Sequence, residues 1–154
     1  MRVSLICVGR LGNAPEAALA LSYAQRATAS GRALSISPVE IVEVEARKGG
    51  MAAEAEAILA RAEGARLIAC DERGRSLASR AFAAQIAALR DDGVRHLAFA
   101  IGGADGLDPA VRAAAAETLS FGVQTWPHAL ARAMLAEQVY RAVTILAGAP
   151  YHRD

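Results

Sequence analysis

The sequence of 154 residues has few of the residue types that indicate a function on their own. It contains two cysteines, three histidines and one tryptophan. Cys7 and Cys70 lie far apart and in no CxxC or Cys/His spacing, so we predict two small buried hydrophobic residues and no metal site. The chain has 17 basic and 16 acidic residues. It therefore lacks the excess of positive charge that is typical of proteins that bind nucleic acid. An RNA partner would have to be recognised by shape and by a local patch.

Long apolar segments are lacking as well. No apolar stretch is long enough to span a bilayer, so we expect no membrane partner. The apolar hexamer at residues 3–8 is too short for the core of a signal peptide, and no cleavage site follows it, so we expect a cytoplasmic protein. With 54% hydrophobic and 21% charged residues, the composition is typical of one globular domain over residues 1–154.

Strand-like and helix-like segments alternate along the chain. Strands are predicted at residues 3–8, 39–44, 67–70 and 96–101, and helices at 15–30, 51–63, 79–90, 109–117 and 129–146. Residues 71–77 are predicted to form a polar loop, and the run 119–126 could be a fifth strand. This alternation is typical of an α/β fold with a parallel sheet and helices on both faces.

The last predicted helix, residues 129–146, is apolar around most of its circumference. Its polar residues are Arg132, Glu137, Gln138, Arg141 and Thr144. A helix with two buried faces would contact the sheet on one side and a second subunit on the other, so we predict a homodimer. The alternative is a helix that is central within a single chain.

A glycine-rich loop, "GGADG" at residues 102–106, follows the fourth predicted strand. Glycine lets a ligand approach the main chain closely, and ligands bind where the carboxyl ends of parallel strands meet. The loop lacks the lysine of a P-loop and the spacing of GxGxxG, and Asp105 and Asp108 disfavour a phosphate. A neutral or cationic ligand, such as a nucleoside with a sulfonium, suits the loop better. A plain turn is the alternative.

Three motifs in order resemble the ribosomal RNA large subunit methyltransferase H family of the SPOUT superfamily. They are "IGGADG" from residue 101, "PHALARAMLAEQVYRA" from residue 127 and the terminal "PYHRD". The resemblance implies a homodimer with a C-terminal trefoil knot, which general rules of chain topology would exclude. It implies S-adenosylmethionine as the methyl donor. It also implies an acceptor, N3 of a pseudouridine in a stem-loop of 23S rRNA on the assembled ribosome.

The resemblance also assigns candidate residues. Those for donor binding are Cys70, Gly102, Gly103, Gly122, Val123, Gln124, Thr125, Trp126 and Pro127. The catalytic candidates Tyr151, His152 and Arg153 lie in the tail, whose alternative is a frayed end. Neutral His152 would accept the N3 proton or position the RNA, and Arg153 would hold a phosphate or stabilise the imide anion.

The candidates for contact with rRNA are four basic residues, each of which also suits a solvated or salt-bridged surface. They are Arg10, Arg47, Lys48 and Arg141. Two other functions stay open: a non-catalytic domain that binds S-adenosylmethionine or a nucleotide on the ribosome, and a knotted methyltransferase that acts on tRNA. The sequence does not assign the proton acceptor, nor the subunit whose tail completes each site.

Overall fold

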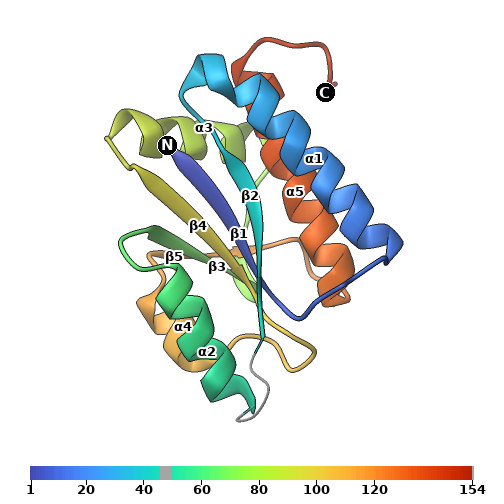
Figure 1. Ribbon diagram of the computed structural model, residues 1–154. Helices are drawn as coiled ribbons and strands as arrows, with labels where there is room; N and C mark the ends of the chain where they lie inside the picture. Colours follow the sequence, from blue (N-terminus) through green and yellow to red (C-terminus); the bar gives the residue numbers. More distant parts are fainter. Residues whose placement is uncertain (46–49, 154) are drawn as a thin grey trace.

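A single five-stranded sheet organises the protein in a computed structural model, which describes residues 1–45 and 50–153 (Figure 1). All strand pairs are parallel, and the order across the sheet is β2-β1-β4-β3-β5. This confirms the predicted α/β class. The elements are β1 (Arg2–Val8), α1 (Pro15–Gly31), the 3₁₀ turn η1 (Arg32–Leu34), β2 (Val39–Val44), α2 (Gly50–Arg61), β3 (Arg66–Ser76), α3 (Ser79–Asp91), β4 (His96–Ile101), α4 (Pro109–Ala114), β5 (Glu117–Ser120) and α5 (His128–Leu146).

The helices cover both faces of the sheet, as predicted. Successive side chains of a strand point to opposite faces. In β1, Val3, Leu5 and Cys7 belong to the core under α1, α3 and α5, whereas Ile6 and Val8 belong to the core under α2 and α4 (Figure 1). The central strand β4 is buried at all six of its residues, which explains its continuous apolar sequence.

The predicted polar loop at residues 71–77 is wrong, because β3 continues to Ser76. Strand β5 pairs with β3 twice, with Leu119 opposite both Cys70 and Arg75. Backbone pairing with β5 therefore keeps polar residues in a strand, although their side chains alone would not predict one. Gly74 permits this approach, since a Cβ there would lie 2.5 Å from the carbonyl carbon of Leu119.

The boundaries of α4 and β5 also differ from the prediction. The helix expected to reach Glu117 ends at Ala114, because Ala115 is already extended and Glu117 begins β5. The fifth strand, expected at 119–126, ends at Ser120. There the Ser120 hydroxyl accepts a hydrogen bond from the backbone N–H of Gly122 and donates one to its carbonyl, so the chain turns instead of extending.

Helix α5 is central within the single chain, which was the alternative to a helix shared with a second subunit. It packs against α1 and α3 and against the sheet. Its apolar circumference is therefore mostly covered without a partner, and that pattern alone does not require a dimer. None of the helices in the described ranges is long and apolar enough to cross a membrane.

Arg132 joins α5 to the sheet from a position that is only 1% exposed. Its Nη1 donates to Glu43 Oε1 at 2.5 Å, and its Nη2 donates to the carbonyl oxygen of Gly9 at 2.9 Å. A buried guanidinium without partners would cost several kcal/mol. The pairing therefore fixes the first half of α5 against the carboxyl ends of β1 and β2.

His96 is held in one neutral form at the opposite end of the sheet. Arg2 Nη2 lies 3.0 Å from His96 Nδ1, and His96 Nε2 lies 2.9 Å from Ser4 Oγ. Because arginine can only donate, Nδ1 accepts and the ring proton is on Nε2. Ser4 Oγ in turn donates to Glu40. Burial, with a smaller effect of Arg2, lowers the pKa of His96, while Glu40 opposes this.

The lowered pKa of His96 makes stability depend on pH. Below about 6.5, the ordinary histidine pKa, the unfolded chain binds a proton that the folded chain does not. We expect the free energy of unfolding to fall as pH decreases from 6.5 through the folded pKa, and to be fully restored above 6.5. Urea unfolding between pH 8 and 5 should show a smaller loss for His96→Gln than for the wild type. An equal loss in both, with His128→Gln as the control, would contradict the assignment.

Candidate functional site

A cavity of about 820 Å³ opens at the carboxyl ends of β4 and β5, beside residues 70–73 in the middle of β3. This volume lies in the range of small-molecule sites, and the position is the usual one for ligands in a parallel sheet. Its walls are residues 70–73, 101–107, 120–122 and 124–128, together with Met51, Pro109, Arg112 and Ala131. We refer to it as the sheet-end cavity.

The sheet-end cavity brings together eight of the nine residues that the sequence suggested for donor binding. The exception is Val123, whose side chain is 99% exposed and does not line the cavity. The wall also includes Asp71, Glu72 and Arg73, which follow the candidate Cys70 and are not among the nine candidates. Nothing in the stretch "DERGR" at residues 71–75 indicates that its last residue pairs with β5.

The glycines at the start of the loop serve its own shape. A Cβ on Gly102 would lie 2.3 Å from the carbonyl oxygen of Gly106, so the loop could not close. Gly106 donates to the carbonyl of Gly103 at 3.1 Å and adopts a φ of +83°. A Cβ on Gly103 would lie 3.2 Å from Val8 Cγ1. Gly102 is thus needed for the turn to close, and the role of both glycines in making room for a ligand stays a prediction.

An ion pair connects three walls of the cavity. Arg112 Nη1 donates to Asp71 Oδ2 at 3.2 Å and also donates to the carbonyl oxygen of Leu107. Asp71 Oδ1 accepts from the backbone N–H of Arg73 at 2.9 Å. Both side chains of the pair are partly shielded from solvent. One guanidinium thus fixes α4, the glycine loop and the outer part of β3 relative to one another.

Both cysteines are protonated thiols at neutral pH. Burial raises the pKa of Cys7 to about 12 and outweighs the opposite effect of Arg132. Burial also raises the pKa of Cys70. Cys70 therefore supplies an apolar wall of the cavity and no nucleophile. Within residues 1–45 and 50–153, no group of three or more His, Cys, Asp or Glu side chains could hold a metal ion.

The C-terminal tail packs on α5 and α1. Tyr151 Oη donates to Glu137 Oε1 at 3.0 Å, and Arg141 Nη1 lies 3.2 Å from His152 Nδ1. None of the described tail residues lines the sheet-end cavity. Arg141 and Ala131, which lies in the cavity wall, are ten residues apart on α5, or about 15 Å along its axis. In Figure 1 the tail lies near the end of α5 that is remote from its first turn.

The four candidates for RNA contact have different positions. Arg10 is exposed and lies 3.4 Å from the Glu45 carboxylate. Arg141 is half-buried and pairs with Glu137 at 2.6 Å, so it belongs to the tail contacts. Arg47 and Lys48 lie outside the described residues.

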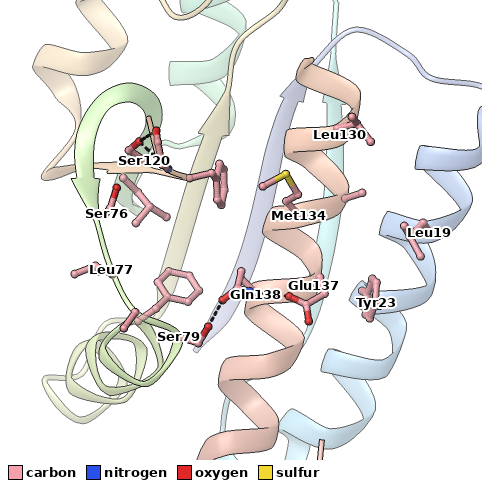
Figure 2. A pocket seen from close by; sticks show the side chains of 16 residues that line it. Leu19, Tyr23, Ser76, Leu77, Ser79, Ser120, Leu130, Met134, Glu137 and Gln138 are labelled. Atoms are coloured by element: carbon pink, nitrogen blue, oxygen red, sulfur yellow. Dashed lines mark hydrogen bonds between the residues drawn. The ribbon is translucent and has the colours of Figure 1, made fainter. Parts of the chain in front are cut away.

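A second cavity of about 570 Å³ lies between α1, α3 and α5 (Figure 2). Its walls are largely apolar, and Ser79 Oγ donates to Gln138 Oε1 at 2.9 Å across it. Leu19 on α1 is 49% exposed and Leu130 on α5 is 40% exposed. We refer to this region as the helix groove. The labelled side chains in Figure 2 come from α1, α5, and the segments around Ser76 and Ser120.

Comparison with known proteins identifies the family. A family model described as a predicted SPOUT methyltransferase matches residues 1–152. The chain belongs to this SPOUT family. A protein from Caulobacter sp. (strain K31), named "Ribosomal RNA large subunit methyltransferase H", is 68% identical over the full length of both chains. A protein of the same name from Phenylobacterium zucineum (strain HLK1) is 65% identical, also over the full length of both chains.

The SPOUT fold is also seen in a solved structure. A probable methylase family protein from Haemophilus influenzae Rd KW20 matches with a TM-score of 0.54 and 13% identity, covering 99% of this chain and 70% of that one. At this identity the match supports the fold alone. The family resemblance inferred from the three sequence motifs is thus confirmed by full-length relatives.

In this SPOUT family member, Gly74 is the position at which β5 and the outer part of β3 meet. We expect Gly74→Ala to destabilise the protein by about 2 kcal/mol, because a new Cβ must displace the backbone of Leu119. Thermal unfolding should show a Tm lower by about 6 °C. Arg75→Ala, at an exposed neighbour in the same strand, is the control and should unfold near the wild-type temperature. An unchanged Tm for Gly74→Ala would show that β5 does not need this approach.

Proposed function

We propose that this protein is an S-adenosylmethionine-dependent methyltransferase that methylates N3 of a pseudouridine in a stem-loop of 23S rRNA on the assembled ribosome. It acts as a homodimer in the cytoplasm, and each chain is one knotted SPOUT-type domain over residues 1–154. The observation that carries the proposal is the sheet-end cavity, which gathers eight of the nine candidate donor residues in a member of this family. The rRNA substrate is taken from the names of relatives such as the Caulobacter protein.

The residues of the sheet-end cavity fit S-adenosylmethionine. Its 820 Å³ accommodate a nucleoside with an amino-acid side arm. Cys70, Phe121 and Trp126 offer apolar walls for an adenine, and the main chain of residues 102–107 offers hydrogen-bonding groups. The carboxylates of the cavity lining, at Glu72 and Asp105, suit the positively charged sulfonium. Arg73 suits the carboxylate of the side arm. When bound there, the donor would supply an already activated methyl group.

The remaining catalytic task is to align the acceptor and exclude water. N3 of pseudouridine becomes reactive on losing its proton, and the anion spreads its charge to the two neighbouring carbonyl oxygens. Donors such as His152 and the exposed Arg153 suit that charge. The tail would thus act on the rRNA base, while the cavity residues act on the donor.

The separation of tail and cavity supports a dimeric site. His152 is held by Arg141, about 15 Å along α5 from the cavity wall. In a dimer, the tail of one chain would complete the cavity of its partner. The helix groove is the face we assign to the second copy, because Leu19 and Leu130, which line it, are 49% and 40% exposed.

The double pairing of β5 supports the trefoil knot. Leu119 pairs with Cys70, before residues 71–74 of β3, and with Arg75, after them. We refer to residues 71–74 as the β3 excursion. The chain then passes through residues 121–127 to α5 on the opposite face of the sheet from α4. A chain threaded through the β3 excursion would have this arrangement.

The proposed activity is tested by transfer of a labelled methyl group. Ribosomes from a strain that lacks the enzyme should be labelled on 23S rRNA, and mass spectrometry should place the methyl group on a pseudouridine. Separated subunits and tRNA are the parallel substrates. Labelling of tRNA alone would favour a different acceptor. No labelling together with no calorimetric binding of S-adenosylmethionine would overturn the proposal.

Removal of residues 151–154 should abolish transfer and leave dimerisation and affinity for S-adenosylmethionine near the wild-type values. The tail lies outside the cavity that we assign to the donor. Gly103→Val is the complementary variant. Its side chain must displace Val8 and push the loop into the cavity, so it should lose donor binding. Ala104→Ser, at an exposed position of the same loop, should keep it.

Mixed dimers of these two inactive chains test the sharing of tails. If each tail serves its partner's cavity, half of the mixed dimers' sites are intact, and a statistical mixture should regain about a quarter of the wild-type rate. Light scattering establishes that the chains are dimers. If each tail serves its own cavity, the mixture should stay inactive, and the assignment of the partner's tail would be wrong.

A further inference from the structure

All three tyrosines of the protein meet where the tail joins α1 and α5. The ring centroids of Tyr140 and Tyr151 are 4.7 Å apart, and those of Tyr23 and Tyr140 are 5.8 Å apart. The guanidinium of Arg26 lies 4.2 Å from the centroid of the Tyr140 ring. Cation–π contacts and aromatic pairs of this kind each contribute about 0.5 to 1.5 kcal/mol. The tail therefore has a defined seat on its own chain.

Tyr151 anchors this seat through its hydroxyl. It donates to Glu137 Oε1 at 3.0 Å, and its oxygen lies 3.4 Å from the hydroxyl of Tyr23. Burial, together with these hydrogen bonds, raises the pKa of Tyr151, so the phenol keeps its proton at neutral pH. The hydroxyl is therefore engaged with groups of its own chain.

Arg141 connects the same seat to His152. Its Nε and Nη2 donate to Glu137 Oε1 at 3.0 and 2.6 Å, and its Nη1 lies 3.2 Å from His152 Nδ1. An arginine has five donors and no acceptor. His152 Nδ1 therefore accepts this hydrogen bond, and in the neutral ring the proton is on Nε2. The position of that proton follows from the partner of the ring, as it does at His96.

The charged and titratable groups around the ring agree with this assignment. On α5 they are Arg141 and Glu137, with the carboxylate already occupied by the guanidinium and by the Tyr151 hydroxyl. On α1, Tyr23 and Arg26 contact the neighbouring Tyr151, the first at its hydroxyl and the second at 5.6 Å from the centroid of its ring. The group that lies 3.2 Å from Nδ1 is thus a cation that can only donate.

We propose that His152 acts on the pseudouridine as an N–H donor from Nε2 and not as the base that removes the N3 proton, and that Arg141 is the positioning residue that fixes this form. The inference rests on the proposed function and deepens it by assigning the role of one residue. His152 would donate to a carbonyl oxygen beside N3, where negative charge develops. Removal of one such donor costs about 10²- to 10³-fold in rate.

The reaction balances without a protein base. The N3–H bond breaks, and the proton goes to water or hydroxide. The electron pair of N3 forms a bond to the methyl carbon while the carbon–sulfur bond breaks, and that pair stays on the sulfur of the thioether product. His152 keeps its proton throughout and stabilises the anion by its hydrogen bond.

The first test measures the form of the ring in the dimer before any substrate is added. Long-range ¹H–¹⁵N correlation of the three histidines at pH 7.5, with His152→Gln used for assignment, should show a protonated Nε2 and an accepting Nδ1 for His152. Arg141→Gln removes the cation, and the ¹⁵N shifts of His152 should then move toward a mixture of both neutral forms. An Nδ1–H form in the wild type would overturn the inference whatever the enzyme's activity.

The second test compares two substitutions at His152 in methyl transfer to ribosomes. Glutamine presents an amide N–H near the position of Nε2 but has no basic nitrogen. We expect His152→Gln to stay within about tenfold of the wild-type kcat and His152→Ala to fall about 10²-fold or more. The affinity for S-adenosylmethionine should be unchanged in both, since the tail does not line the cavity.

The pH profile separates a donor from a base. A base with an ordinary histidine pKa would make kcat rise to a plateau above about pH 6.5. A donor predicts that kcat keeps rising with pH in both the wild type and His152→Gln. If glutamine is as inactive as alanine, or if a plateau of the wild type disappears in His152→Gln, the donor role is wrong. An inactive wild type would instead count against the proposed function, and the ring measurement would still test Arg141.

Discussion

The pairing of β5 with two separated parts of β3 is the constraint on which the functional half of the molecule depends. It holds Cys70 and Arg75 on either side of Leu119, and Gly74 allows the two backbones to approach. One consequence is that the polar stretch after Cys70 becomes a wall of the sheet-end cavity. Another is that residues 120–127 leave the sheet beside the glycine loop. Without this pairing, the two walls of the cavity would have no fixed relation to each other.

Helix α5 connects the sheet-end cavity, at its first turns, with the C-terminal tail, which packs on its second half. Its first turns line the cavity at His128 and Ala131, and Arg132 fixes that end to β1 and β2. Its second half carries Glu137 and Arg141, which hold the tail. Because a helix is rigid over this length, the tail cannot fold back onto the cavity of its own chain without losing these contacts. The proposed supply of the tail by a partner chain would satisfy this constraint.

The sequence predicts those parts of the fold in which the side chains themselves indicate burial or form a motif. The buried strands β1 and β4 are largely apolar, and the loops that hold the candidate donor residues carry recognisable motifs, so both could be placed. The outer part of β3 could not, because Arg75 and Ser76 pair with Leu119 and Ser120 of β5, which are distant in sequence. The central place of α5 was missed for a related reason, since its apolar circumference suits α1 and α3 as well as a second subunit. Nor does the sequence show that Arg141 contacts His152, which depends on how the tail returns along α5.

The near balance of basic and acidic residues is explained in part by arginines that form ion pairs within the fold. Arg112, Arg132 and Arg141 each pair with a carboxylate inside the fold, at Asp71, Glu43 and Glu137. These cations organise the protein and leave little excess positive charge for bulk attraction to phosphates, which is the term that makes RNA binding strong and indiscriminate. An enzyme built in this way would bind free RNA weakly. Selectivity for one nucleotide of an assembled particle would then come from shape and from the tail, whose histidine is oriented before the substrate arrives.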